Sequence, residues 1–267
     1  MRLWDTFLFR DELDMLECRL VQFEGYPVYR HVLVEAPVDH RGHPKPLHYA
    51  ENRERFAPWA DQIVHVVADE LAGMGAPSDV REHAWQRESA QRQAVSRGMD
   101  GAEPGDQVIL ADVDEIPNAA AITAVMSGWA GVMEMTHCMF AVDWSWGQLK
   151  TSPVTRAGAI SSFGQARREI WGNGTVLPRS GHHLTWLGDQ AALRAKLDAT
   201  CHVEVIRETL QSLDSNVYYR EGVNPFARYG LPGFQLQPVD VNENWPRWVW
   251  ERRCPPHWFR PRPEGES

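Results

Sequence analysis

The segment GDQVILADVDEIP, residues 105–117, has the clearest structural pattern in this chain. Residues 108–111 form an apolar run whose length and β-branched content are typical of a strand buried on both faces of a parallel sheet. Asp112, Asp114 and Glu115 follow the run, and Pro117 ends it because proline cannot donate a ladder hydrogen bond. We therefore expect these acids at the carboxyl end of the strand, where open α/β sheets bind ligands.

The spacing of these acids indicates a metal site. In an extended segment Asp112 and Asp114 would point to one side and Glu115 to the other. Close carboxylates repel each other unless a cation lies between them, and oxygen ligands suit Mg²⁺ or Mn²⁺, which complete their coordination with substrate phosphates. The pattern favours a metal-diphosphate site, and the alternative is a solvated acidic turn without function.

The first half of the chain alternates strands and helices. Strands are expected at residues 3–9, 31–36, 63–68 and 108–111, with helices between them and a further helix from Asn118, its cap, to Met126. This alternation predicts an α/β fold with a mostly parallel sheet, right-handed crossovers and flanking helices. Glu35 and Asp69 also end strands, so we expect all these acids in a single crevice.

The second half is less regular. We expect one long strand or a hairpin at residues 131–144, loops at 151–174, an apolar segment at 175–187 and a helix at 189–200 with Leu193 and Leu197 facing inward. The segment after Pro238 is rich in Trp, Pro and Arg. We therefore expect a single domain, residues 1–237, with a C-terminal arm, residues 238–267, packed on it.

Composition excludes several classes of protein. The net charge of −9 argues against nucleic-acid binding, which needs a basic face. No run approaches the roughly 20 apolar residues that span a bilayer, and acids in residues 1–14 argue against a signal peptide, so we expect a cytoplasmic protein. The four cysteines have no CxxC spacing, which indicates neither a zinc site nor a disulfide framework.

Two further features have open interpretations. Glu88 and Arg92 are spaced i, i+4 in an expected helix at residues 85–99 and would form a surface pair, although Arg87 and Arg92 are also placed to reach a phosphate or ribose. The 12 tryptophans are compatible with stacking against a sugar, but burial in the core or an interface is their commoner use.

Several ordered motifs together resemble glycosyltransferase family 17, the family of the enzyme that adds a bisecting GlcNAc. The resemblance runs through most of the chain: FRDELDMLECRL (9–20), VLVEA (32–36), WQRESAQR (85–92), VILADVDEIP (108–117), GHHLTWLG (181–188), KLDATCHVE (196–204) and NENWPRWVWE (242–251). An ordered series of motifs is far more specific than a DxD pattern alone.

The resemblance implies a transferase of the Rossmann-like GT-A type. It would invert configuration, use UDP-GlcNAc with Mn²⁺, and transfer the sugar to a saccharide or glycoconjugate acceptor. Asp112 and Asp114 would hold the metal and the sugar nucleotide, and His183 would be a third metal or diphosphate contact, with His182 as the neighbouring alternative. Glu12, Glu35 and Asp69 would line the uridine and ribose pocket, supported by three residues of one helix, Arg87, Glu88 and Arg92.

The mechanism would need a base as well as a metal. The metal would neutralise charge on the leaving diphosphate, and a carboxylate within hydrogen-bond reach would activate the acceptor hydroxyl. Asp143, close in sequence to Trp144 and Trp146, is the first candidate for that base, with Glu115 and Glu169 as the others.

Two other functions stay open on the sequence. One is a DxD-type Mg²⁺-dependent phosphatase or nucleotide hydrolase, although such phosphatases place the motif near the N-terminus and follow it with Thr. The other is a non-catalytic carbohydrate-binding protein that uses the tryptophans, which would bind sugar regardless of metal or of Asp114.

Overall fold

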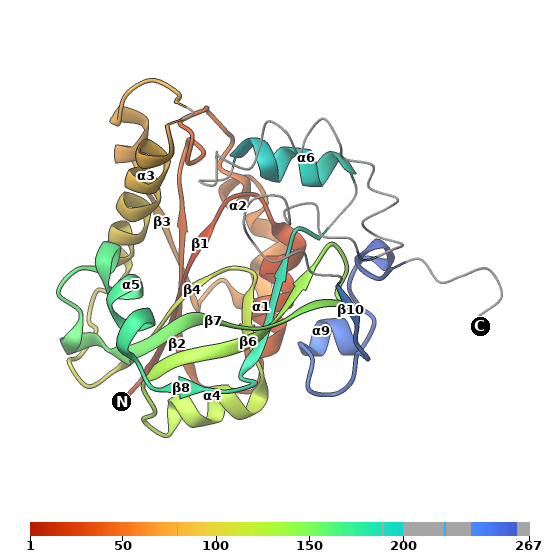
Figure 1. Cartoon of the computed structure of the whole chain (residues 1–267). Helices are drawn as coiled ribbons and strands as arrows, with labels where there is room; N and C mark the ends of the chain where they lie inside the picture. Colours follow the sequence, from red (N-terminus) through yellow and green to blue (C-terminus); the bar gives the residue numbers. More distant parts are fainter. Residues whose placement is uncertain (79, 188–189, 200–221, 223–235, 261–267) are drawn as a thin grey trace.

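The computed structural model describes residues 1–78, 80–187, 190–199, 222 and 236–260 (Figure 1). Its centre is one sheet with β3-β2-β1-β4 at one side and β7-β6-β9-β5 at the other, β8 and β10 pairing with β6 and β7. The strands are β1 (Leu3–Phe9), β2 (Val28–Glu35), β3 (Ile63–Val67), β4 (Gln107–Asp112), β5 (Glu115–Pro117), β6 (Gly131–Met139), β7 (Trp144–Arg156), β8 (Val176–Leu177), β9 (Gly181–Thr185) and β10 (Gln237–Pro238).

Helices cover both faces of this sheet (Figure 1). Side chains of β1 alternate between two buried clusters, Phe7 and Phe9 facing one and Trp4 and Leu8 the other, as a strand buried on both faces requires. The first cluster lies under α1, α4 and α9, and the second under α3 and α5. The helices are α1 (Leu13–Phe23), α2 (His48–Glu51), α3 (Arg81–Gln93), α4 (Ala119–Met126), α5 (Phe163–Asn173), α6 (Gln190–Ala199) and α9 (Arg247–Trp250).

The predicted α/β class, with a Rossmann-like sheet between helices, is confirmed. Strands β3, β2, β1 and β4 are parallel neighbours, and each lies within three residues of its expected position. The side chain of Asn118 caps α4 by accepting a hydrogen bond from the amide of Ala121 at 2.9 Å, as expected. Helix α3 begins earlier than predicted, at Arg81, and continues as a 3₁₀ helix, Ala94–Gly98.

The prediction of loops over residues 151–174 is wrong. Strand β7 continues to Arg156 between β4 and β6, pairing antiparallel with both, and α5 follows it. Val154 is fully buried in this position, so pairing on both sides stabilises a segment whose local sequence favours turns. The expected helix at 189–200 is confirmed as α6, with Leu193 buried. The side chain of Leu197, which was also expected to face inward, is outside the described part of the structure. Cys201 is outside it as well.

The acidic segment also differs from a single strand. Strand β4 ends at Asp112, a turn follows, and β5 begins at Glu115 and pairs antiparallel with β9. The turn changes the chain direction, so the simple alternation expected for Asp112, Asp114 and Glu115 does not hold. All three instead face one cavity.

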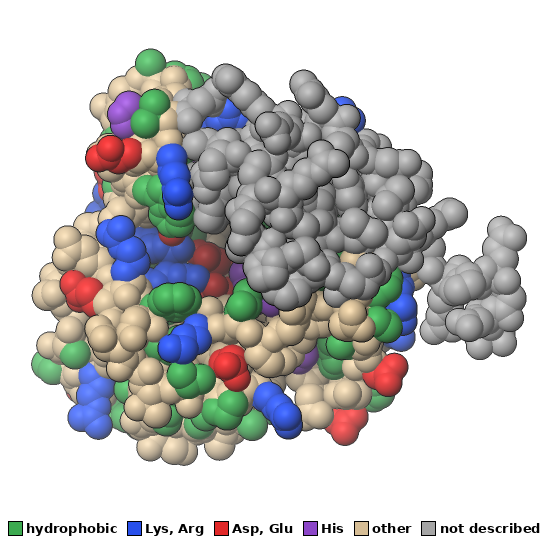
Figure 2. Space-filling model, viewed as in Figure 1, with side chains coloured by type: hydrophobic (Ala, Val, Ile, Leu, Met, Phe, Trp, Pro, Cys, Tyr) green, Lys and Arg blue, Asp and Glu red, His purple; other side chains and the backbone are tan. Residues whose placement is uncertain are grey.

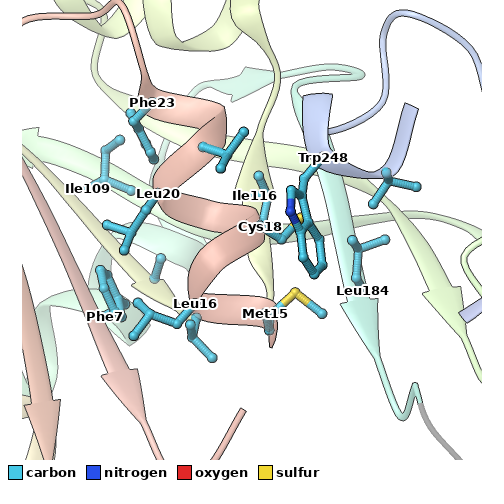
Figure 3. Close-up of a cluster of buried hydrophobic side chains, with 14 of the residues drawn as sticks. Phe7, Met15, Leu16, Cys18, Leu20, Phe23, Ile109, Ile116, Leu184 and Trp248 are labelled. Atoms are coloured by element: carbon cyan, nitrogen blue, oxygen red, sulfur yellow. The ribbon is translucent and has the colours of Figure 1, made fainter. Parts of the chain in front are cut away.

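The C-terminal part of the described chain contributes to the main core. Trp245, Trp248 and Trp258 belong to the cluster under α1. In Figure 3 Trp248 lies beside Cys18 and Ile116. Cys18, Cys138 and Cys254 are free and buried. Within the part of the chain that the structure describes, no helix combines the length and apolar character needed to cross a bilayer.

Gly98 marks a tight contact between the sheet and its helical layer. A Cβ at this position would meet Val32 and would lie 3.0 Å from a methyl carbon of Val66. We expect Gly98→Ala to lower the free energy of unfolding by about 1–3 kcal/mol, because two core valines must move. Urea denaturation measures this, with Gly105→Ala as the control, since a Cβ there meets nothing within 4 Å. Equal stability of the two variants would contradict the prediction.

Candidate active site

A cavity of about 620 Å³ opens at the carboxyl ends of β1 and β4, with walls from α3, α5, β6, β9 and α6. Figure 2 shows Lys and Arg side chains beside Asp, Glu and His side chains on one face of the molecule. Many of the residues expected at the site line this cavity: Glu12, Glu88, Arg92, Asp112, Asp114, Glu115 and His183.

The two aspartates of the turn have separate cationic partners. Asp112 accepts a hydrogen bond from Arg92 of α3 at 2.7 Å, and Arg167 of α5 lies 3.3 Å from its other oxygen. Asp114 lies 3.2 Å from Nζ of Lys196 on α6 and 3.4 Å from Nε2 of His183 on β9. The turn therefore binds four basic side chains from four elements, which places it at the centre of the site.

These partners keep both aspartates ionised. Burial by itself would raise the pKa of Asp112, but Arg167 and Arg92 outweigh it and lower that pKa to about 2. For Asp114 burial is likewise outweighed, here by Lys196 and His183, which hold its pKa well below the usual range. Both aspartates are negatively charged at neutral pH. An anionic ligand in the cavity would compete with them for the same basic side chains.

A buried arginine supports the turn from beneath. Arg19 on α1 is fully buried and its guanidinium is paired with Asp5 of β1, at 2.9 Å for Nε. Its Nη1 donates to the backbone carbonyls of Asp112 at 3.2 Å and Glu115 at 2.7 Å. Asp5 also contacts Nδ1 of His31 at 2.8 Å. This network holds both ends of the acidic turn in one position.

Glu115 has a different environment from the two aspartates. It is 1% exposed, and its carboxylate accepts hydrogen bonds from Arg167 at 2.9 Å and from Ser152 at 2.8 Å. The same carboxylate accepts the backbone amide of Asp112 at 3.0 Å. Glu115 therefore ties α5 and β7 to the turn, and Arg167 is shared between Glu115 and Asp112.

The two adjacent histidines of β9 lie in opposite directions. His183 contacts Asp114 in the cavity, whereas His182 stacks on Trp245 with ring centroids 4.1 Å apart, and burial lowers its pKa to about 3. Gly181 allows β9 to approach β5 closely, because a Cβ there would meet the carbonyl oxygen of Ile116. That approach brings His183 opposite Glu115 in the strand register.

The predicted pairing of Glu88 with Arg92 is confirmed, at 2.8 Å between Nη2 and Oε1, but the expectation of a surface pair is wrong, since both side chains are largely buried and line the cavity. Arg92 also donates to Asp112, so one guanidinium binds both Glu88 on helix α3 and Asp112 in the acidic turn. Burial would raise the pKa of Glu88, but Arg92 lowers it overall. Glu12 accepts the amides of Arg10 and Asp11, both at 3.2 Å, and so closes the loop after β1 at the cavity edge.

Besides His182, five residues expected at the site do not line the cavity: Glu35, Asp69, Arg87, Asp143 and Glu169. Glu35 is fully buried, 3.1 Å from His65 and with Lys45 as a second partner, and Asp69 is exposed, so the expected single crevice of all strand-end acids is wrong for these two. Arg87 is buried and donates to three backbone carbonyls of residues 74–76. Asp143 accepts hydrogen bonds from the amide and Nε of Arg260.

Aromatic side chains form much of the remaining wall of the cavity. Trp85, Trp146, Trp171 and Trp186 line it together with His137. The ring of His137 contacts those of His183, at 4.6 Å between centroids, and Trp146, at 5.2 Å. Nζ of Lys196 lies 5.6 Å from the ring centroid of Trp186. The charged turn and the aromatic wall are thus adjacent parts of one site.

The comparison with known families decides the class of this protein. A family model described as glycosyltransferase family 17 matches residues 1–216. The chain belongs to glycosyltransferase family 17. It is therefore a glycosyltransferase, with a sugar donor and an acceptor as its substrates.

The other two comparisons give less information about this family 17 chain. No curated protein matches the chain. A solved structure titled "Crystal structure of 4-diphosphocytidyl-2C-methyl-D-erythritol synthase" is similar at 14% identity and a TM-score of 0.41, covering 72% of this chain and 95% of that one.

The side chains at the turn of this glycosyltransferase include two of the group types that bind divalent cations in proteins, a carboxylate and an imidazole. Among the described residues no group of three His, Cys, Asp or Glu converges on one point, so the expected set of Asp112, Asp114 and His183 is not a preformed three-ligand site. Asp114 and His183 do converge, at 3.4 Å. Mg²⁺ and related cations commonly use one or two protein ligands and complete their coordination with water and substrate phosphates.

Sequence reasoning missed several residues of the site in this family 17 chain. Arg167 and Trp171 lie on α5, in a segment expected to be loop, and Lys196 lies on an expected helix, where its only signal was its place at the start of the KLDATCHVE motif. Arg19 belongs to the FRDELDMLECRL motif, which was the one available signal for it. The four residues come together only through tertiary packing.

Proposed function

We propose that this family 17 glycosyltransferase is metal-dependent and inverting, and that it transfers GlcNAc from UDP-GlcNAc to a hydroxyl of a saccharide or glycoconjugate. The observation that carries the proposal is the acidic turn after β4, whose Asp112 and Asp114 face a cavity among basic side chains. GlcNAc and the acceptor class come from the family resemblance.

The residues around the turn have complementary roles in this proposal. Asp114 and His183 would hold Mn²⁺ or Mg²⁺, which supplies charge neutralisation for the leaving diphosphate when bound. Arg92, Arg167 and Lys196 would exchange their carboxylate partners for diphosphate oxygens, since they line the same cavity. Glu12 and Glu88 would contact the nucleoside from the edges of β1 and α3.

Charge stabilisation would be the main contribution of the protein to catalysis. The basic side chains already lie beside the turn, so once they had moved to the bound diphosphate they would be in place when negative charge develops on the leaving group. Of the acids proposed as base, Glu115 alone lines the cavity, and Asp143 and Glu169 do not. We therefore favour Glu115 over the other two for that role, in which its carboxylate would be released from Arg167 as that side chain moves to the diphosphate.

A donor screen tests this function. Purified protein is incubated with UDP-GlcNAc, UDP-glucose, UDP-galactose and GDP-mannose in millimolar Mn²⁺, and release of the nucleoside diphosphate is measured. We expect UDP release to be fastest from UDP-GlcNAc, to stop on addition of EDTA and to return with excess Mn²⁺. Faster release from another donor would contradict the GlcNAc assignment, and release that persists in EDTA would contradict the metal requirement.

A further inference from the structure

His137 lies in the cavity with an unexplained polar atom. Its side chain on β6 is 7% exposed and lines the cavity, yet its Nδ1 has no hydrogen-bond partner among the described residues. A buried polar atom without a partner has a desolvation cost, which native proteins tolerate mainly where a ligand or water completes the bond. The position of His137 in the cavity wall makes a bound substrate the natural partner.

A β-bulge places Trp146 next to His137. His137 pairs with Gly147 and the next residue, Cys138, pairs with Ser145, so Trp146 is the extra residue of β7. Bulges redirect side chains and occur often beside active sites. Here the amide of Gly147 donates to Oγ of Ser145 at 3.0 Å, which closes the bulge, and the Trp146 ring lies 5.2 Å from that of His137.

A chain of contacts connects this aromatic pair to the acidic turn. Asp114 lies 3.4 Å from His183, whose ring centroid is 4.6 Å from that of His137, and Trp146 is the next contact. A diphosphate bound at Asp114 would place the donor sugar at the next residue in this series of contacts, His183. A second sugar ring, the acceptor, would then lie against Trp146.

The chemistry of the pair fits a neutral sugar. Arg92, Arg167 and Lys196 pair with the carboxylates of the turn, whereas His137, Trp146 and Met139 offer aromatic and apolar surface to the cavity. A pyranose ring presents C–H groups on its face and hydroxyls at its edge, which match an indole face and an imidazole nitrogen. Pockets of this kind commonly combine apolar walls with a few polar groups that orient the ligand.

We propose that Trp146 and His137 form the acceptor subsite, in which a neutral pyranose ring stacks on Trp146 and one of its hydroxyls hydrogen-bonds to Nδ1 of His137. This inference rests on the proposed function, because it assumes a sugar nucleotide bound at the acidic turn. It extends that function by assigning the class of acceptor, an uncharged saccharide, and the residues that select it.

The test separates donor handling from acceptor binding. UDP release from UDP-GlcNAc is measured first with water as the only acceptor, and then with a panel of neutral methyl glycosides and disaccharides and matched glucuronides. The proteins compared are wild type, Trp146→Ala, Trp146→Phe and His137→Phe. Trp250→Ala is the control, since Trp250 is exposed on α9 and does not line the cavity. Circular dichroism and Tm report whether each variant folds.

We expect neutral glycosides to accelerate UDP release by the wild type. Trp146→Ala should raise the acceptor KM about tenfold, as expected for loss of an aromatic stacking contact, a larger fold-change than its effect on release to water. Trp146→Phe should recover part of the effect, and His137→Phe should raise the acceptor KM by a larger factor than the donor KM. An unchanged acceptor KM in folded Trp146→Ala, no acceleration by any neutral glycoside, or preference for glucuronides would overturn the subsite. Absence of UDP release from wild type would instead overturn the proposed function and the subsite with it.

Discussion

Asp114→Asn is expected to lower kcat/KM for UDP release by about 10²–10³-fold, the usual effect of removing one preorganised electrostatic group from an active site. The substitution keeps the shape of the side chain and removes the charge that faces Lys196 and His183. A neutral amide is also a much poorer ligand for Mn²⁺ or Mg²⁺ than a carboxylate. Loss of activity should therefore accompany weaker binding of both the metal and the donor.

Steady-state UDP release and calorimetric titration with UDP and Mn²⁺ measure these effects. The matched control is Asp14→Asn, since Asp14 on α1 also pairs with an arginine, Arg55, but does not line the cavity. Its activity should stay within about twofold of wild type, as expected for a surface ion pair. If Asp114→Asn kept the wild-type kcat/KM, the acidic turn would not be the catalytic centre.

Arg19→Met is expected to lower the free energy of unfolding by about 3–5 kcal/mol, because removing one partner of a buried ion pair leaves the other charge uncompensated. Arg19 and Asp5 are both fully buried. The substitution also removes the donors to the carbonyls of Asp112 and Glu115, so the turn loses its support from beneath. Any folded Arg19→Met protein should accordingly have lower donor turnover than wild type.

Urea denaturation followed by tryptophan fluorescence measures the stability of this variant. Arg55→Met is the control, because Arg55 pairs with Asp14 and Glu17 at the surface and its loss should lower the free energy of unfolding by about 0–1 kcal/mol. A double variant, Arg19→Met with Asp5→Leu, should recover part of the lost stability, since it leaves no unpaired buried carboxylate. If Arg19→Met and Arg55→Met lowered the free energy of unfolding equally, the buried ion pair would contribute no more to stability than the surface one.

The first half of the fold followed from local pattern. Four apolar runs at strand length, separated by helical segments, were enough to predict that β1, β2, β3 and β4 lie parallel in one sheet, whereas their order came from the structure. Residues 151–174 could not be predicted in the same way, because the turn-forming residues there are overridden by pairing with β4 and β6 and by packing of α5 against α3. Non-local pairing of this kind has no signature in a short window of sequence.

The residues of the candidate site divide in the same way, into those that the sequence placed correctly and those that it did not. Asp112, Asp114 and His183 carried local or motif signals and all line the cavity. Glu35 and Asp69 carried the same kind of signal, a carboxylate at a strand end, but the first is enclosed by His65 and Lys45 and the second points to solvent. A strand end places a residue at the correct edge of the sheet, and its neighbours determine where its side chain points.

The sequence alone determined that an acidic pair follows a buried strand, because apolar runs and proline act through local backbone geometry. Only the tertiary structure decided which groups surround that pair: Arg167, Lys196, His137 and Trp146 come from elements far away in the chain. The physical reason is that charge pairing and burial depend on distances across the fold, and such distances are not encoded in the spacing of residues along it.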